Sequence, residues 1–176
     1  MSAVASSLKI GQPDDPDTVL GPIQNAMQYE RVKGFFAESA EKKHTFAAGS
    51  PEIPDKGKGF FVTPSIIDNP PSDSRLVQEE PFGPIVPTQP WDDEEEVIAR
   101  ANDTTFGLGA CVWGADIDRA QRIARRLQAG SVFVNSFEKP THAATLGGHK
   151  ESGIGSEYGN TGWMAYCNPH VIHLYK

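Results

Sequence analysis

The chain has few cysteines, no long apolar run and no excess of positive charge. Its two cysteines, Cys111 and Cys167, do not make a CxxC pair and cannot form a disulfide framework, so we expect two buried free thiols. No stretch approaches the roughly 18 apolar residues of a membrane-spanning helix. With 16 basic against 23 acidic residues, the net charge of -7 offers no field that would attract nucleic acid or an anionic membrane.

The start of the chain lacks a charged segment followed by an apolar block, so we expect no secretory leader and, by default, a cytoplasmic location. Hydrophobic residues make up 38% of the 176 residues, and 17 Gly with 14 Pro stay below a low-complexity level. This composition excludes a disordered chain, a collagen-like repeat and a disulfide miniprotein, and it is typical of a globular protein.

Hydrophobic periodicity predicts an α/β fold with a mainly parallel sheet flanked by helices. Strands alternate with helices from residue 85 onward, which is the signature of right-handed crossover units. An acidic run at 92–96 marks a helix start, because acidic residues complement the helix dipole there. Pro87 favours a sheet edge. The expected helices are 28–43, one opening at 92–96, and 117–128, and the expected strands are 60–62, 66–67, 85–88, 108–113 and 131–135.

The positions of two segments, the loop 135–150 and the tail 168–176, indicate possible binding sites. The loop 135–150 follows the last strand, at the edge where α/β proteins usually place ligands. Within it His142, with Glu138 nearby, is the best candidate for acid–base work, although an exposed loop histidine is the commoner case. The tail 168–176 alternates enough to form a separate strand that could pair with a partner chain.

The run Glu79–Pro84 precedes a strand and places a carboxylate, Glu80, two residues before an aromatic, Phe82. In extended backbone these side chains would share one face, where they could hold a sugar and a flat ring. On spacing alone, a surface Glu and a packed Phe before a turn are the commoner case. The Gly-rich stretch 147–155 is not GxGxxG, and we expect close packing or positive φ there. The five histidines have no metal-ligand spacing, so we predict no metal site.

These pieces, in this order, resemble the C-terminal third of the aldehyde dehydrogenase superfamily. The resemblance covers nearly the whole chain and implies part of the catalytic domain over 1–166 and an oligomerisation strand over 167–176. The matching blocks are Leu8–Gly11, Gly21–Ile23, Gly59–Ser65, the EEPFGP run Glu79–Pro84, Ala101–Leu108, Gln128–Asn135 and Gly147–Gly153.

The resemblance also implies roles for particular residues. Glu80 matches the residue that hydrogen-bonds the nicotinamide ribose of NAD(P), and Phe82 matches the aromatic beside the nicotinamide. The loop lining the aldehyde pocket corresponds to Phe137, Glu138, Pro140 and Leu146. This chain departs from the family at Thr145–Leu146, where Pro-Phe is usual, and at Ser156, where Arg is frequent.

In the family, the nucleophilic cysteine, the general-base glutamate, the oxyanion-hole asparagine and the dinucleotide-binding domain lie upstream of the first residue here. Neither Cys111 nor Cys167 matches the nucleophile. Without an activated thiolate no covalent intermediate can form. The isolated chain is therefore not expected to oxidise aldehydes or to need a cofactor.

Three functions remain open at this stage. The chain could be an inactive piece or degenerate copy of an aldehyde dehydrogenase. It could be a redox-free isomerase, cyclase or dehydratase that acts on a small carbonyl compound through His142 or Glu138. It could also be a non-catalytic partner in an oligomer. In each case we expect a homo-oligomer, formed as a dimer or by swapped elements through an exposed sheet edge or the tail.

Overall fold

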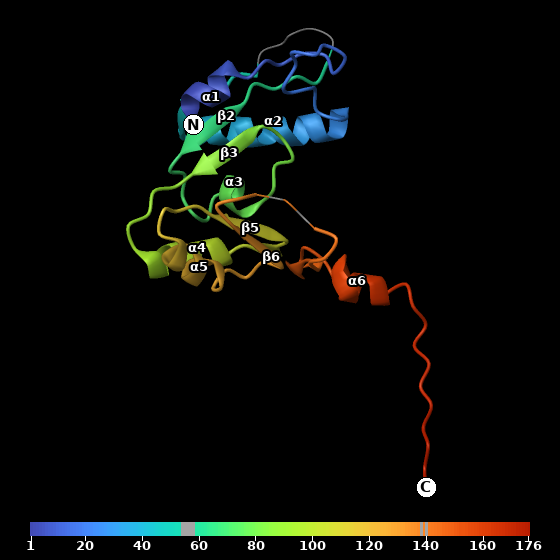
Figure 1. The fold of residues 1–176 in the computed structure, drawn as a ribbon. Coiled ribbons are helices and arrows are strands. Elements are labelled where there is room, and N and C mark those ends of the chain that lie inside the picture. The colour runs from blue at the N-terminus through green and yellow to red at the C-terminus, as the bar shows by residue number, and fades with distance from the viewer. Residues whose placement is uncertain (54–58, 138, 140) are drawn as a thin grey trace. The chain divides into compact units, whose positions relative to one another are not determined.

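The structure is a computed structural model, and it describes residues 1–53, 59–137, 139 and 141–176. The chain divides into two compact units, Met1–Pro90 and Trp91–Lys176. Figure 1 traces both, with the first unit running from blue to green and the second from green to red. No helix in the described ranges combines the length and the apolar character needed to cross a bilayer.

The first unit contains a small mixed sheet. Strand β1 (Thr45–Ala48) pairs antiparallel with β2 (Ser65–Asp68), and β2 pairs parallel with β3 (Ile85–Thr88). The helices of this unit are α1 (Ser2–Ser7), α2 (Ala26–Glu41) and α3 (Arg75–Gln78).

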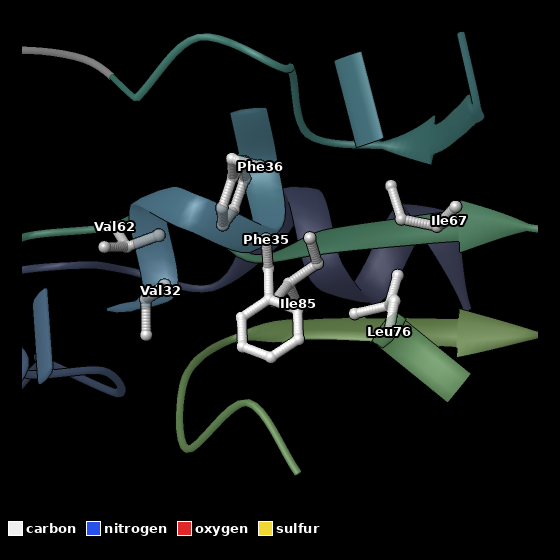
Figure 2. Packing of buried hydrophobic residues seen from close by; sticks show 7 residues of the cluster. All are labelled: Val32, Phe35, Phe36, Val62, Ile67, Leu76 and Ile85. Atoms are coloured by element: carbon white, nitrogen blue, oxygen red, sulfur yellow. The ribbon is translucent and has the colours of Figure 1, made fainter. Parts of the chain in front are cut away.

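Helix α2 supplies much of the apolar core of this unit. It begins after Asn25, whose side chain accepts a hydrogen bond from the backbone N–H of Gln28 and so satisfies a free donor of the first turn. Residues three and four apart on a helix share a face, and on α2 that face is buried. Figure 2 shows it against the strands, in a cluster of Val32, Phe35, Phe36, Val62, Ile67, Leu76 and Ile85.

Strand β3 lies at an edge of the sheet, as its proline predicts. The N–H of Ser65 donates to Pro84 O, and that of Asn69 donates to Thr88 O. The backbone N–H and C=O groups of Val86 and Thr88 therefore point towards β2, whereas those of the odd-numbered residues of β3 point away from it. Pro87, which has no N–H to donate, falls on the outward side and removes no bond from the ladder.

The second unit is built around one crossover. Strand β5 (Gly109–Val112) pairs parallel with β6 (Ser131–Val134), and α5 (Ile117–Ala124) connects them and packs on both. Around it lie α4 (Glu94–Asn102), α6 (Gly159–Met164) and two short antiparallel pairs. These pairs join β4 (Phe106–Gly107) to β8 (His149–Lys150), and β7 (Leu146–Gly147) to β9 (Ser156–Glu157).

Charged pairs connect α4 with α5 and with the turn that follows α5. Arg119 donates to Glu94 at 2.9 Å, and Arg126 forms a two-pronged pair with Glu95. Their hydrogen bond lowers the pKa of Glu95 below its ordinary value. Asp93 caps the start of α4, as the acidic run predicts.

The α/β class is confirmed, but the described sheets are smaller and more mixed than the expected mainly parallel sheet. Parallel pairing joins β2 to β3 and β5 to β6, and the other described strand pairs are antiparallel. The expected strand at 60–62 is wrong, because these residues pair with no described strand. The expected helix 117–128 ends at Ala124.

Two expectations about the second unit need correction. Cys111 is exposed and Cys167 is only partly buried, so the expectation of two buried thiols is wrong. Exposed and half-buried residues alternate along β5, and Cys111 falls on the exposed side. The tail 168–176 has no regular secondary structure in this single chain, and its apolar side chains are exposed. The pairing of the tail with a partner stays a prediction.

Candidate cofactor and substrate loops

The loop Glu79–Gly83 joins α3 to β3 and lies against α2. The N–H of Glu79 donates to Arg75 O at its start, and the N–H of Ile85 donates to Gly83 O at its end. Gly83 lies so close to α2 that an added Cβ would come within 2.6 Å of a Val32 methyl group. Glycine is therefore required here to let the loop approach the helix.

Side chains of α2 bond to main-chain oxygens of this loop. The Gln28 amide nitrogen, Nε2, donates to Pro81 O at 2.7 Å and to Phe82 O at 3.3 Å. One turn further along, Arg31 Nη2 donates to Glu80 O at 3.1 Å. Three consecutive carbonyls of the loop thus accept hydrogen bonds from one face of α2.

The two neighbouring glutamates of the loop differ in their surroundings. Glu79 pairs with Arg75 at 3.0 Å and with Arg31 at 3.4 Å. No side chain among the described residues forms a hydrogen bond or an ion pair with the Glu80 carboxylate, and Glu80 is exposed. The carboxylate of Glu79 is thus engaged in two ion pairs within the protein, whereas the carboxylate of Glu80 is accessible to a ligand.

Phe82 has an unfavourable backbone conformation and an exposed ring. Its φ is 51°, in the left-handed region, and 67% of its surface is exposed. The expectation of extended backbone is therefore wrong at Phe82, so the shared face of Glu80 and Phe82 cannot be derived from strand alternation. A bulky residue in this conformation costs about 1–2 kcal/mol and persists only where its neighbours hold it. Such outliers are common at ligand sites.

The loop 135–150 begins at the end of β6. The N–H of Asn135 donates to Val112 O, which continues the pairing of β5 with β6 by one residue. Phe137 is 64% exposed. Glu138 and Pro140 lie outside the described residues.

The remaining candidates of this loop lie near α6. The carbonyl of His142 accepts a hydrogen bond from the N–H of Gly159, at the start of the helix, and His142 is exposed. No hydrogen bond or ion pair joins its imidazole to another described residue. Leu146 is half-buried in β7, opposite Glu157. An exposed imidazole without a described carboxylate partner offers no prepared acid–base pair.

The Gly-rich stretch serves packing, as its sequence predicts. A Cβ on Gly130 would lie 1.7 Å from Gly147 O, and one on Gly148 would lie 2.7 Å from the Ser152 carbonyl carbon. Gly153 and Gly155 have φ of 143° and 93°. Within the described ranges, no group of three or more His, Cys, Asp or Glu side chains could hold a metal ion.

Glu80 and Phe82 share one loop of the first unit, and Phe137, His142 and Leu146 share one loop of the second. Gln28 and Arg31 contact the first of these loops, and the sequence patterns did not reveal these contacts. Their partners lie 53 and 49 residues further along the chain, and no local pattern encodes such contacts.

Comparison with known proteins decides the family. The family model described as "Aldehyde dehydrogenase family" matches residues 1–172. The chain belongs to the aldehyde dehydrogenase family. It is 38% identical over 174 residues to betaine aldehyde dehydrogenase of Bacillus subtilis, an alignment that covers 98% of this chain and 35% of that protein. It is 42% identical over 156 residues to 4-trimethylaminobutyraldehyde dehydrogenase of Rattus norvegicus, covering 86% of this chain and 32% of the relative.

The fold agrees with solved aldehyde dehydrogenase structures. A mutant aldehyde dehydrogenase C of Pseudomonas syringae, in complex with NAD+ and octanal, superposes with a TM-score of 0.87 at 35% identity, covering 94% of this chain and 34% of that one. The chain spans about a third of the length of these aldehyde dehydrogenases. The resemblance to the family, over about a third of its members' length, is thus confirmed.

Proposed function

We propose that Glu80 and Phe82 contact the nicotinamide ribose and the nicotinamide in an NAD(P)-dependent aldehyde dehydrogenase. Residues of the loop 135–150 would form part of the aldehyde-facing wall. The observation that carries this proposal is the contrast within the loop Glu79–Gly83. Glu79 is engaged by two arginines, whereas the exposed Glu80 carboxylate has no partner among the described residues. A carboxylate accepts hydrogen bonds only, and it suits the hydroxyl donors of a ribose.

The residues of this loop fit the nicotinamide end of such a cofactor. In an aldehyde dehydrogenase the nicotinamide accepts a hydride from the substrate. Glu80 would accept hydrogen bonds from the ribose, and the exposed ring of Phe82 would offer a flat apolar face to the nicotinamide. In the second unit, the resemblance assigns Phe137, Glu138, Pro140 and Leu146 to the aldehyde-facing wall, and the exposed ring of Phe137 would offer apolar surface to an aldehyde.

The 176 residues alone are not expected to oxidise aldehydes. Cys111 lies in β5 and Cys167 follows α6, and by resemblance neither occupies the place of the nucleophile. The redox-free alternative rests on His142 and Glu138, and no described contact favours it. If it were correct, His142→Ala or Glu138→Gln would abolish turnover of a carbonyl substrate without unfolding the protein. A cytoplasmic location stays a prediction from the sequence.

Saturation-transfer NMR of the 176-residue chain with NAD+ tests the proposal. We expect transfer to the nicotinamide and ribose protons. Glu80→Gln should weaken binding about tenfold, because hydrogen bonds to charged groups are stronger than neutral ones. Phe82→Ala should reduce the nicotinamide signals. Glu41→Gln and Met27→Ala, two exposed positions of α2, are the matched controls. Equal transfer in wild type and Glu80→Gln would contradict the proposal, and so would NADH formation from simple aldehydes by this chain.

We also propose that the tail 167–176 is an oligomerisation strand. Ile172, Leu174 and Tyr175 are between 73% and 91% exposed, which is unusual for apolar side chains in a monomer. Light scattering should give more than one chain per particle, and a smaller mass after deletion of residues 168–176. A single-chain mass for the intact protein would contradict this.

A further inference from the structure

The loop that carries Glu80 and Phe82 depends on contacts to α2. Three consecutive carbonyls, of Glu80, Pro81 and Phe82, accept hydrogen bonds from Gln28 and Arg31. No other described donor bonds to these three carbonyls. The conformation of the loop therefore has a small and identifiable set of supports.

The strain at Phe82 shows why these supports matter. With an exposed ring and a φ of 51°, Phe82 gains little from packing and would relax if the loop were released. The bonds from Gln28 lie on either side of this residue, since they end on the carbonyl before it and on its own carbonyl.

Arg31 acts on the other end of the loop. One of its guanidinium nitrogens, Nη2, reaches both Glu80 O at 3.1 Å and the Glu79 carboxylate at 3.4 Å. Because Arg31 binds the main chain of Glu80 and the side chain of Glu79, it fixes the backbone while leaving the Glu80 carboxylate outside the ion pair. This arrangement separates the roles of the two glutamates.

We propose that Gln28 and Arg31 are positioning residues, which hold the loop Glu79–Gly83 in the strained conformation that presents Glu80 and Phe82. That these two side chains bind a ligand rests on the function proposed above. That Gln28 and Arg31 fix the loop does not, so the two claims can fail separately.

Gln28→Glu is the sharpest test, because it keeps the size of the side chain and replaces the donor by an acceptor. Gln28 is the third residue of α2, where a glutamate favours the helix through the dipole and the capping box. A role confined to the helix therefore predicts an unchanged or more stable protein. A positioning role predicts a loosened loop in a helix that remains intact.

Limited chymotrypsin cleavage after Phe82 measures the loosening. Phe137 is 64% exposed against 67% for Phe82, and cleavage after it provides an internal reference. We expect the ratio of cleavage at Phe82 to cleavage at Phe137 to rise about fivefold in Gln28→Glu, as for the loss of one net hydrogen bond. Arg31→Lys, which keeps the charge but lacks the fork, should raise the ratio less. Gln24→Glu, the same change at an exposed position before α2, should leave it unchanged.

Backbone NMR provides the second measurement. The heteronuclear NOEs of the Phe82 and Gly83 amides should fall in Gln28→Glu, while those of Val32 and Phe35 within α2 should stay at wild-type values. An unchanged cleavage ratio and unchanged NOEs would overturn the proposal, and so would loosening of α2 and the loop together.

NAD+ titration of the same variants separates the two claims. Loosening of the loop in Gln28→Glu, together with weaker NAD+ binding than in Gln24→Glu, supports both. If wild type binds no NAD+, the proposed function fails, and the positioning role stands or falls on the cleavage and NMR results alone.

Discussion

The side chain of Asn135 holds the main chain of Gly114 through two hydrogen bonds. The N–H of Gly114 donates to Asn135 Oδ1 at 2.8 Å, and Asn135 Nδ2 donates to Gly114 O at 2.8 Å. The amide thus acts like one more residue of a strand, and it ties the turn after β5 to the start of the loop 135–150. Asn135 also has a φ of 50°, a conformation that asparagine tolerates better than most residues.

Asn135→Ala should therefore destabilise the second unit by about 1–2 kcal/mol, through two lost hydrogen bonds and the strain of alanine in the left-handed region. Asn135→Gly removes the bonds without that strain and should cost less. Urea unfolding followed by tryptophan emission measures both variants. The chain has 3 Trp, at positions 91, 113 and 163, so the emission reports on the second unit. Wild-type stability in Asn135→Ala would show that the bonds to Gly114 contribute nothing.

Gly130→Ala should be among the most damaging small substitutions in the second unit. Its Cβ would lie 1.7 Å from Gly147 O, so the backbone would have to move. We expect a loss of at least about 3 kcal/mol, which is large for a point mutation. Gly109→Ala is the matched control, because the nearest atom to its Cβ is 3.9 Å away. The same tryptophan-detected unfolding applies, and equal effects of the two substitutions would contradict the close approach.

Phe82→Gly should stabilise the first unit relative to Phe82→Ala by about 1 kcal/mol, because glycine adopts a φ of 51° without a steric penalty. Native-state hydrogen exchange of the Val32, Phe35 and Phe36 amides in α2 provides the readout. Higher stability of Phe82→Gly than of the wild type, combined with weaker NAD+ binding, would indicate that Phe82 is kept for a ligand. Equal stability of the two variants would mean that the loop relaxes to another φ.

The ion pair of Glu95 with Arg126 should make stability depend on pH. The hydrogen bond to Arg126 holds the pKa of Glu95 below its ordinary value in the folded protein. The contribution of this ion pair to the free energy of unfolding is therefore present above the pKa of glutamate in the unfolded chain, about 4.3. It is lost as pH falls further, through the folded pKa. The stability difference between wild type and Glu95→Gln should be constant near neutral pH and shrink in acid. Glu151→Gln, at a carboxylate with no ion pair among the described residues, should show no such trend.

The sequence predicted those helices and strands that are marked by neighbouring residues, such as an apolar run or an acidic helix start. Strand β3 has the bounds that its apolar run indicated, and α4 starts where the acidic residues and the Asp93 cap place it. The run Phe60–Val62 has the composition of a strand but no described partner, and composition cannot supply one. Strands β4, β7, β8 and β9 have two residues each, which is too short to show a periodicity, and each depends on a partner strand elsewhere in the chain.

The candidate site likewise has features that the local sequence indicated and features that depend on distant contacts. The EEPFGP run and its resemblance pointed to Glu80 and Phe82, but neither could reveal that Glu79 is the engaged carboxylate and Glu80 the open one. That distinction arises from Arg31 and Arg75, which reach the loop from two different helices. The backbone of Phe82 was likewise expected to be extended, because a contact from Gln28 over 53 residues is invisible to a pattern of neighbours.

The outward placement of Pro87 has a consequence for how this protein behaves at high concentration. A second polypeptide that paired with the outer edge of β3 would find no backbone N–H donor at Pro87, and the proline ring would hinder its approach. Edge-to-edge addition of a strand, through which exposed sheet edges aggregate, is thus discouraged at β3 by a single residue, and no hydrogen bond between β2 and β3 is lost.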